Sequence, residues 1–307
     1  MAFATRSTTA KQDSSQTHFC CGIVVNMSNH RRAFTLVELM VTVSIIALLI
    51  GLLVPALGSM RRAGWATKSQ SNLRQWGMAM DSWASIHDDT LPWEGSKVAA
   101  DMGTNLANPN FWPNALAGML GVDSYATISE RAFQEQRNVD NWDGAETVWN
   151  DPGAVVTRSE PWSFGDAGKG GLRRQFWFNY GMNYRLNQTL LQQAGVPEAS
   201  TAVMVRTAHI AFADRTIYMF ELRAQEGELA IDDPHRNASL DRASAGWKRY
   251  AARYSNGGHS VFADGHVSWF GNEEATTNAQ GSRVPSTPNG DWNNGKLIWD
   301  PLGPALN

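Results

Sequence analysis

The sequence predicts an α+β protein in which a long N-terminal helix leads into a largely antiparallel β head. An apolar run of 24 residues, 34–57, contains a single charged residue, Glu38. Apolar residues then recur every three or four positions as far as residue 87, which is the spacing of one helix face. Short runs with the alternation of strands follow in the second half of the chain.

The composition fits one membrane segment and one sizeable globular domain. The chain has 307 residues, 43% of them hydrophobic, and a formal net charge of −3. A head of roughly 200 residues buries a core without disulfides. The cysteines, Cys20 and Cys21, are adjacent and precede the apolar run, so they build no disulfide framework. Neither a basic excess nor zinc-finger or Walker-type spacing points to nucleic acid.

The apolar run 34–57 is long enough to cross a membrane. At about 1.5 Å per residue it forms a helix of roughly 36 Å, against a hydrocarbon core of about 30 Å. The apolar region of an ordinary signal peptide is shorter, about 7–15 residues. Basic residues flank both ends, Arg31 and Arg32 before the run and Arg61 and Arg62 after it. The positive-inside rule therefore leaves the orientation open.

A processing site is indicated by residues 31–38, which read RRAFTLVE. This segment resembles the cleavage site of type IV prepilins and type II secretion pseudopilins, where a basic and a small residue precede Phe, and Glu is the fifth mature residue. The resemblance implies cleavage between Ala33 and Phe34 by prepilin peptidase and N-methylation of Phe34. It also implies a cytoplasmic leader, an inner-membrane anchor and a periplasmic head. The family usually has Gly where this chain has Ala33, which predicts slower processing.

Glu38 needs a partner if the segment lies in a membrane. A carboxylate in a membrane helix costs about 2.5–3.5 kcal/mol. Cleavage would create a positive α-amine at Phe34, and we expect Glu38 of one subunit to pair with that amine on a neighbouring pilin or pseudopilin subunit. The alternative is a Glu38 that reaches the lipid headgroups and has no role in assembly.

Two further alternatives concern the N-terminus. Arg31 and Arg32 also fit a twin-arginine export signal, with a small-x-small cleavage site at 56–58. Glu38 and the length of the apolar run argue against that alternative. Met27 lies seven residues before Phe34, so it is a second candidate start beside Met1.

Four segments follow from these features: a leader at 1–33, a transmembrane helix at 34–57, an amphipathic stalk at 58–87 and a head at 88–307. Pro55 is expected to kink the helix rather than end it. The apolar stripe of the stalk comprises Ala66, Ser69, Leu73, Trp76, Met80, Trp83 and His87. In the head we expect a helix at 113–120 and strands at 175–180, 208–212, 216–222 and in a pair after residue 258.

The best-defined local structure of the head is a β-hairpin built on Asp264, Gly265 and His266. An Asp-Gly pair between two alternating apolar runs predicts a two-residue turn, because both turn positions need a positive φ. In that register Ala263 pairs with His266, and Phe262 pairs with Val267. Trp269 then lies on the same face as Phe262 and Val267.

The hairpin resembles the H-x9-DG module of large prepilin-type proteins. Asp264 and Gly265 match its Asp-Gly pair, but Tyr254 stands at the position of its histidine. His259 and His266 lie nearby without filling that position. Whatever the histidine does in relatives is therefore absent or replaced in this chain.

His259, Asp264 and His266 have side chains of types that bind metals. The predicted register separates the two histidines by roughly 13 Å, so we expect exposed histidines and a turn aspartate without a metal. The sequence shows no G-x-S-x-G motif, cysteine nucleophile or phosphate loop, so no catalytic residues are predicted. A metal-dependent exported hydrolase that needs His266 is the enzymatic alternative.

Oxygen-rich loops at 140–144 and 291–295 raise calcium as an alternative to plain turns, although neither has EF-hand spacing. No other cofactor is predicted. Thirteen tryptophans favour a core rich in large aromatics, and the alternative is an aromatic surface that binds polysaccharide. We therefore expect a structural subunit of a type IV pilus or type II secretion pseudopilus. The alternative is a membrane-tethered or filament-displayed glycan-binding module.

Overall fold

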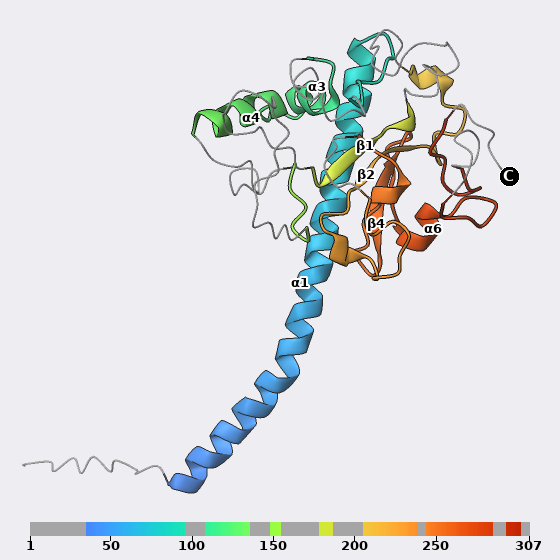
Figure 1. The fold of residues 1–307 in the computed structure, drawn as a ribbon. Coiled ribbons are helices and arrows are strands. Elements are labelled where there is room, and N and C mark those ends of the chain that lie inside the picture. The colour runs from blue at the N-terminus through green and yellow to red at the C-terminus, as the bar shows by residue number, and fades with distance from the viewer. Residues whose placement is uncertain are drawn as a thin grey trace, which may run out of the picture. The chain divides into compact units, whose positions relative to one another are not determined.

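The computed structural model describes residues 35–95, 108–135, 148–154, 178–186, 205–238, 244–284 and 293–301. The chain divides into two compact units, 1–54 and 55–307. A long helix, α1 (Leu36–Ile86), begins in the first unit and continues into the second. A five-stranded sheet and several short helices complete the second unit, so the α+β fold is confirmed (Figure 1).

Helix α1 contains 51 residues and passes through Pro55 without ending. Its side chains change character along its length. Most of those before residue 69 are exposed, whereas a stripe spaced by three and four residues is buried from there on. The buried residues are Ser69, Asn72, Leu73, Trp76, Gly77, Ala79, Met80, Trp83 and Ala84. The predicted stalk stripe is thus confirmed over its central part, while Ala66 and His87 are only half-buried.

The sheet has the strand order β3-β1-β2-β4-β5. Three pairs, β1 with β2, β2 with β4 and β4 with β5, are antiparallel, and β3 joins the edge of β1 in parallel. The predicted antiparallel head is therefore confirmed with one parallel edge added. The strands are β1 (Tyr180–Asn183), β2 (Ile217–Glu221), β3 (Ser244–Ala245), β4 (Gly257–Phe262) and β5 (Val267–Gly271).

The buried half of α1 lies on one face of the sheet. Gly77 makes the closest approach, because a Cβ atom at this position would lie 2.6 Å from Cγ2 of Val261 in β4. Along the same helix, Trp76 donates a hydrogen bond from Nε1 to the carbonyl of Val148 at 3.1 Å. Trp76 also packs edge-on against Trp112 and Trp149. Aromatic packing thus extends the core sideways from the stalk.

Two helices flank that aromatic cluster: α3 (Trp112–Met119) and α4 (Tyr125–Gln134). The predicted helix at 113–120 corresponds to α3 and is confirmed within one residue. Phe178 lies between the two helices, with its ring centroid 5.5 Å from that of Trp112 and 4.7 Å from that of Tyr125.

The opposite face of the sheet has its own aromatic layer. Phe220 of β2 stacks on Tyr250 at 5.7 Å and meets Trp299 edge-on at 4.9 Å. The hydroxyl of Tyr250 donates to the carbonyl of Gly258 and also bonds with the hydroxyl of Ser260 in β4.

The remaining described elements of the head are short helices. Three are 3-10 turns, η3 (Thr207–His209), η4 (Glu226–Glu228) and η5 (Trp247–Arg249), and one is an α-helix that follows β5, α6 (Asn272–Thr276).

One predicted strand is wrong and another is shifted. Residues 208–212 form no strand, because the amides of His209 and Ile210 bond three residues back, to the carbonyls of Arg206 and Thr207. The strand predicted at 175–180 begins only at Tyr180, and residues 175–177 lie outside the described residues. The strand predicted at 216–222 is confirmed as β2.

Strands β4 and β5 form the predicted hairpin, but its predicted register is wrong by one residue. Val261 pairs with Val267, and the amide of Phe262 donates to the carbonyl of His266. The loop therefore has three residues, 263–265, with a φ of +83° at Gly265. An Asp-Gly sequence also suits this loop, in which a type I turn is followed by a left-handed glycine.

The one-residue shift changes which side chains share a face. Phe262 lies opposite His266, and their rings stack at 4.4 Å with an interplanar angle of 2°. Trp269 lies opposite His259 rather than on the face of Phe262. Because His259 and His266 belong to alternate positions of the ladder, they point to opposite faces, whereas the predicted register placed them on the same one.

Gly77→Ala tests the close approach of α1 to β4. The added methyl would overlap Val261, so we expect a loss of about 1–3 kcal/mol in the free energy of unfolding. The measurement is urea unfolding of the full-length chain in lipid nanodiscs, followed by tryptophan fluorescence.

Gly64→Ala is the matched control on the same helix. Apart from the backbone of the helix itself, no atom of the described residues lies within 4 Å of a Cβ atom at Gly64, so the same methyl should stabilise the helix by about 0.5–1 kcal/mol. Equal effects of the two substitutions would contradict the tight contact.

Candidate functional site

The first turn of α1 is closed by a reciprocal pair of side chains. Thr35 Oγ1 accepts a hydrogen bond from the amide of Glu38 at 3.2 Å, and Glu38 Oε2 accepts one from the amide of Thr35 at 2.9 Å. Thr35 Oγ1 also donates to the same carboxylate oxygen at 2.9 Å. This is a capping box, in which a threonine and a glutamate three residues later satisfy free amides at the helix start. Glu38 therefore shapes the start of the helix.

The helix that follows this cap presents apolar side chains to its surroundings. Between Leu36 and Met60 its large hydrophobic residues are 52–73% exposed. Among the described residues, α1 is the one helix long and apolar enough to cross a membrane. A protein surrounded by water rarely exposes so large an apolar surface, so this half of the helix needs lipid or other helices around it.

A comparison with protein families decides what this segment is. Residues 28–54 match the family model of the prokaryotic N-terminal methylation motif. The N-terminal segment is prepilin-like. The match spans the predicted cleavage position and the apolar start of α1, and it supports membrane anchoring of the chain. No curated protein and no solved structure matches the chain.

The prepilin-like segment holds three of the predicted site residues. Glu38 lies at the third position of α1, within the capping box. Ala33 and Phe34, the predicted cleavage and methylation positions, lie outside the described residues. Their roles stay predictions, because the family match covers their positions without testing the chemistry of each residue.

In the hairpin of the head, Asp264 and His266 bond to each other. Asp264 Oδ1 accepts from the amide of His266 at 3.1 Å and lies 2.5 Å from His266 Nδ1. Burial raises the pKa of the Asp264 carboxyl, but the hydrogen bonds from His266 outweigh that effect and lower it. The aspartate thus acts as a turn residue, as the sequence predicts. No cluster of three metal-ligating side chains occurs within the described ranges.

The exposure of His259 differs from the prediction. It was expected on the surface, yet it is only 7% exposed, and its Nδ1 lies 2.8 Å from Oε1 of Glu221. The amide of His259 also donates to Oε2 of the same carboxylate at 3.1 Å. The physical reason is that both faces of β4 are buried, and His259 lies on the same face as Val261, which packs against Gly77 of α1.

Glu221 is the centre of a buried polar network between helix and sheet. Besides His259, its Oε1 accepts a hydrogen bond of 2.5 Å from the hydroxyl of Ser69 in α1. Ser69 in turn bonds with the hydroxyl of Tyr180 in β1, to which Asn72 also donates. Burial raises the pKa of Glu221, while the hydrogen bond with His259 opposes the rise.

The three side chains Ser69, Glu221 and His259 do not form a hydrolase triad. In a triad the histidine bonds to the serine and takes its proton, whereas here Glu221 lies between the two. Ser69 is also fully buried, so no substrate reaches its hydroxyl. The network therefore joins the stalk to the sheet.

Sequence reasoning missed this network, although a signal was present. Glu221 is a carboxylate in an otherwise apolar run, Ile217–Leu222, and Ser69 lies on the apolar stripe of the stalk. A charged residue in a buried strand predicts a partner, because unpaired burial is costly. The pattern does not say which helix supplies that partner.

A second polar group lies beside the first and involves Tyr254, the residue at the position of the module's histidine. The hydroxyl of Tyr254 donates to Asp151 Oδ1, and Arg253 Nε bonds with Oδ2 of the same aspartate at 2.6 Å. Arg253 also pairs with Glu228 at 3.0 Å. Tyr254 therefore holds a buried loop in place.

The loop considered for calcium uses its amide oxygens internally. Asn293 Oδ1 accepts from the amides of Trp299 and Asp300, and Asn294 Oδ1 accepts from those of Lys296 and Leu297. Both oxygens thus cap turns. Residues 140–144 and 291–292 lie outside the described residues.

The tryptophans of the head support the prediction of an aromatic core, with one exception. Trp269 is 45% exposed, more than any other tryptophan that the structure describes. Trp142, Trp162, Trp177 and Trp292 lie outside the described residues. The buried tryptophans of the head are Trp93, Trp112, Trp149, Trp247 and Trp299.

Ser69→Ala tests the link between stalk and sheet. It removes a hydrogen bond to a buried carboxylate, so the free energy of unfolding should fall by about 1–3 kcal/mol. Urea unfolding of the full-length chain in lipid nanodiscs measures the change.

Ser71→Ala removes the same hydroxyl from an exposed position of the same helix and should change stability by no more than about 0.5 kcal/mol. A Ser69→Ala variant as stable as this control would show that the network does not hold the stalk.

Proposed function

We propose that the protein is a structural subunit of a type IV pilus or a type II secretion pseudopilus. Its leader is removed by prepilin peptidase, its helix is anchored in the inner membrane, and its head lies in the periplasm. The observation that carries the proposal is the coincidence of the methylation motif with the exposed, apolar first part of α1.

The exposed apolar surface of α1 gives the subunit a face on which the helices of neighbouring subunits can pack. In the bilayer, lipid covers these side chains, and in a filament the helices of neighbouring subunits replace the lipid. A charged leader held in the cytoplasm keeps the subunit in the membrane, because moving its arginines through hydrocarbon is costly. Removal of the leader therefore releases the helix for assembly.

Glu38 has one carboxylate oxygen in use and one available. Oε2 caps the first turn through Thr35, and no hydrogen bond to Oε1 occurs among the described residues. Thr35 directly follows Phe34, whose α-amine is created by cleavage. Glu38 can therefore keep its cap and still accept a neighbouring subunit's amine, which offsets both charges in apolar surroundings.

The buried polar network between α1 and the sheet also supports a role as a filament subunit. Ser69, Asn72 and Gly77 place hydrogen bonds and a close contact between the stalk and three strands, β2, β1 and β4. A subunit in a filament is pulled through its helix, so the head has to stay attached to that helix. The polar side chains of this network, Ser69, Glu221 and His259, are buried and bonded within it, so we propose a structural rather than an enzymatic head.

Processing is tested by expressing the full-length chain with a prepilin peptidase and measuring the intact mass. The mature chain should begin at N-methyl-Phe34. Ala33→Gly should shorten the time for half-processing several-fold, because the family's usual glycine is restored, and Ala33→Leu should block cleavage. A chain that begins at Ser59 would mean an export signal, and an uncut chain would mean a plain anchor; either result contradicts the proposal.

Assembly is tested by Glu38→Gln, which keeps the size of the side chain and removes its charge. The neighbouring α-amine would then be buried without a counter-charge, at a cost of about 3–5 kcal/mol, so filament yield should fall at least roughly tenfold. Sheared filaments are quantified by immunoblot, with cleavage of the leader as the internal control. Thr42→Val, a polar-to-apolar change one turn further along, should assemble normally.

A further inference from the structure

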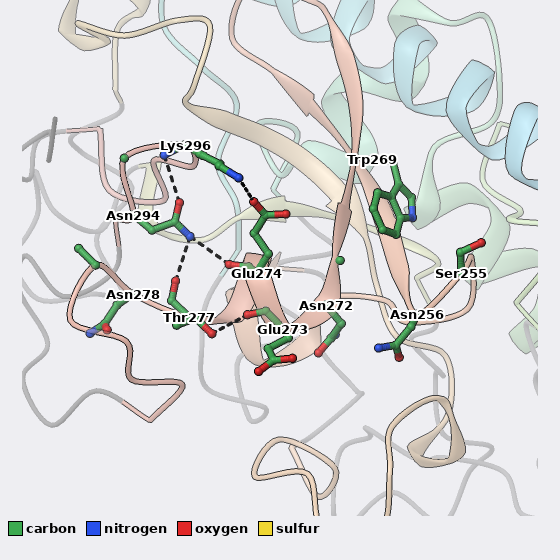
Figure 2. Close-up of a pocket in the computed structure, with 13 residues that line it drawn as sticks. Ser255, Asn256, Trp269, Asn272, Glu273, Glu274, Thr277, Asn278, Asn294 and Lys296 are labelled. Carbon is green, nitrogen blue, oxygen red and sulfur yellow. Dashed lines mark hydrogen bonds and ion pairs between the residues drawn. The ribbon is translucent and has the colours of Figure 1, made fainter.

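An open cleft of about 840 Å³ lies at the edge of the sheet beside Trp269. Its walls come from the turn at 255–256, the end of β5, α6 and the segments at 277–279 and 294–296 (Figure 2). A cleft of this size falls within the range of small-molecule sites, about 300–1,000 Å³. It belongs to the head alone and is separate from the assembly segment.

Trp269 is held rigidly at the margin of this cleft. Its indole N–H donates to the carbonyl of Tyr254 at 2.8 Å. The ring also lies against Gly257, where a Cβ atom would come within 2.6 Å of Cζ2. Only glycine permits this contact. The exposed part of the indole is therefore a preformed apolar surface that loses little conformational freedom when a ligand binds.

One wall of the cleft is braced by its own hydrogen bonds. Asn294 Nδ2 donates to the carbonyls of Glu274 and Thr277 at 3.0 and 2.9 Å. Lys296 pairs with the carboxylate of Glu274 across the same wall (Figure 2). These groups fix the shape of the cleft.

Other polar groups of the cleft have no partner within the described part of the chain. They are the carboxylate of Glu273, the carboxamide of Asn256 and the hydroxyl of Ser255, all on exposed residues. Ser255 and Asn256 both have left-handed backbone, with φ of +52° and +60°. The cleft thus offers acceptors and donors next to an aromatic surface.

This combination matches the chemistry of a sugar ring. A pyranose has one face of C–H groups with partial positive charge, which the negative face of an indole attracts, and an edge of hydroxyls that carboxylates and carboxamides bind. Glu273 and Glu274 against Lys296 give the cleft one net negative charge, which disfavours uronates and sulfated sugars. We propose that this cleft binds a neutral glycan, with Trp269 as the stacking surface and Glu273 and Asn256 as hydroxyl-binding groups.

The inference does not depend on filament assembly. The site serves a subunit in the membrane and one displayed on a filament alike. Among the described residues of the head, it assigns the glycan-binding alternative to Trp269, since the other described tryptophans of the head lie in the interior and offer no surface to a polymer.

The test is isothermal titration calorimetry of the full-length, uncleaved chain in lipid nanodiscs, which avoids sugar-based detergents. The probes are hexasaccharides of β-1,4-glucose, β-1,4-mannose and β-1,4-N-acetylglucosamine, with a galacturonate hexasaccharide for comparison. At least one neutral probe should bind with a Kd between about 10 μM and 1 mM. Trp269→Ala should weaken that binding at least about tenfold, and Glu273→Gln about three- to tenfold.

Matched controls separate the site from general effects. Trp65→Ala removes a tryptophan from α1, and Glu226→Gln neutralises an exposed carboxylate of η4; both should bind like the wild type. Glu273 is exposed, so Glu273→Gln remains informative if Trp269→Ala fails to fold. Absence of binding by all neutral probes at about 10 mM would overturn the proposal, as would unchanged affinity in both cleft variants or preference for the uronate. A failure of processing would leave these results unaffected.

Discussion

The buried carboxylate of Glu221 is the interaction on which the union of helix and sheet depends. It accepts a hydrogen bond from Ser69 of α1 and lies against the imidazole of His259 in β4. A buried carboxylate is costly unless its oxygens are satisfied, and here donors from two different elements are needed. The geometry therefore selects one position of the helix along the sheet, and the close approach of Gly77 to Val261 selects the same one.

Helix α1 is one continuous helix whose two parts have different surfaces. Its first part carries apolar side chains all round, as suits lipid or a bundle of like helices. Its last part is amphipathic and turns its aromatic residues to the head. The change occurs near Ser69, where a polar residue begins the buried stripe. A single helix thus belongs to the membrane at one end and to a protein core at the other.

The periodicity of the sequence predicted the positions of the helices and strands better than it predicted how they pair and pack. The spacing of Leu73, Trp76 and Met80 was sufficient to locate the buried face of α1, since three- and four-residue steps specify a helix face. The Asp-Gly pair located the hairpin but not its register, because two- and three-residue loops both accept that pair. The exposed position predicted for His259 was wrong for another reason: both faces of β4 are covered, so its side chain is buried.

The candidate sites also differ in whether the sequence could predict them. The prepilin-like segment is local in sequence, so RRAFTLVE was sufficient to indicate it, and the family match covers it. The cleft beside Trp269 is formed by residues 255–256, 269–279 and 294–296. No spacing pattern in the sequence predicts that these three segments lie close together. Composition favoured an aromatic core and left an aromatic surface as the alternative, and only burial distinguishes Trp269 from the other described tryptophans.

Tyr254 joins the interior of the head to its surface. Its hydroxyl holds the buried carboxylate of Asp151, while its carbonyl holds the indole of Trp269 at the margin of the cleft. The carbonyl belongs to the backbone, so a substitution at Tyr254 would act on the indole only by shifting the chain that the buried hydroxyl holds in place.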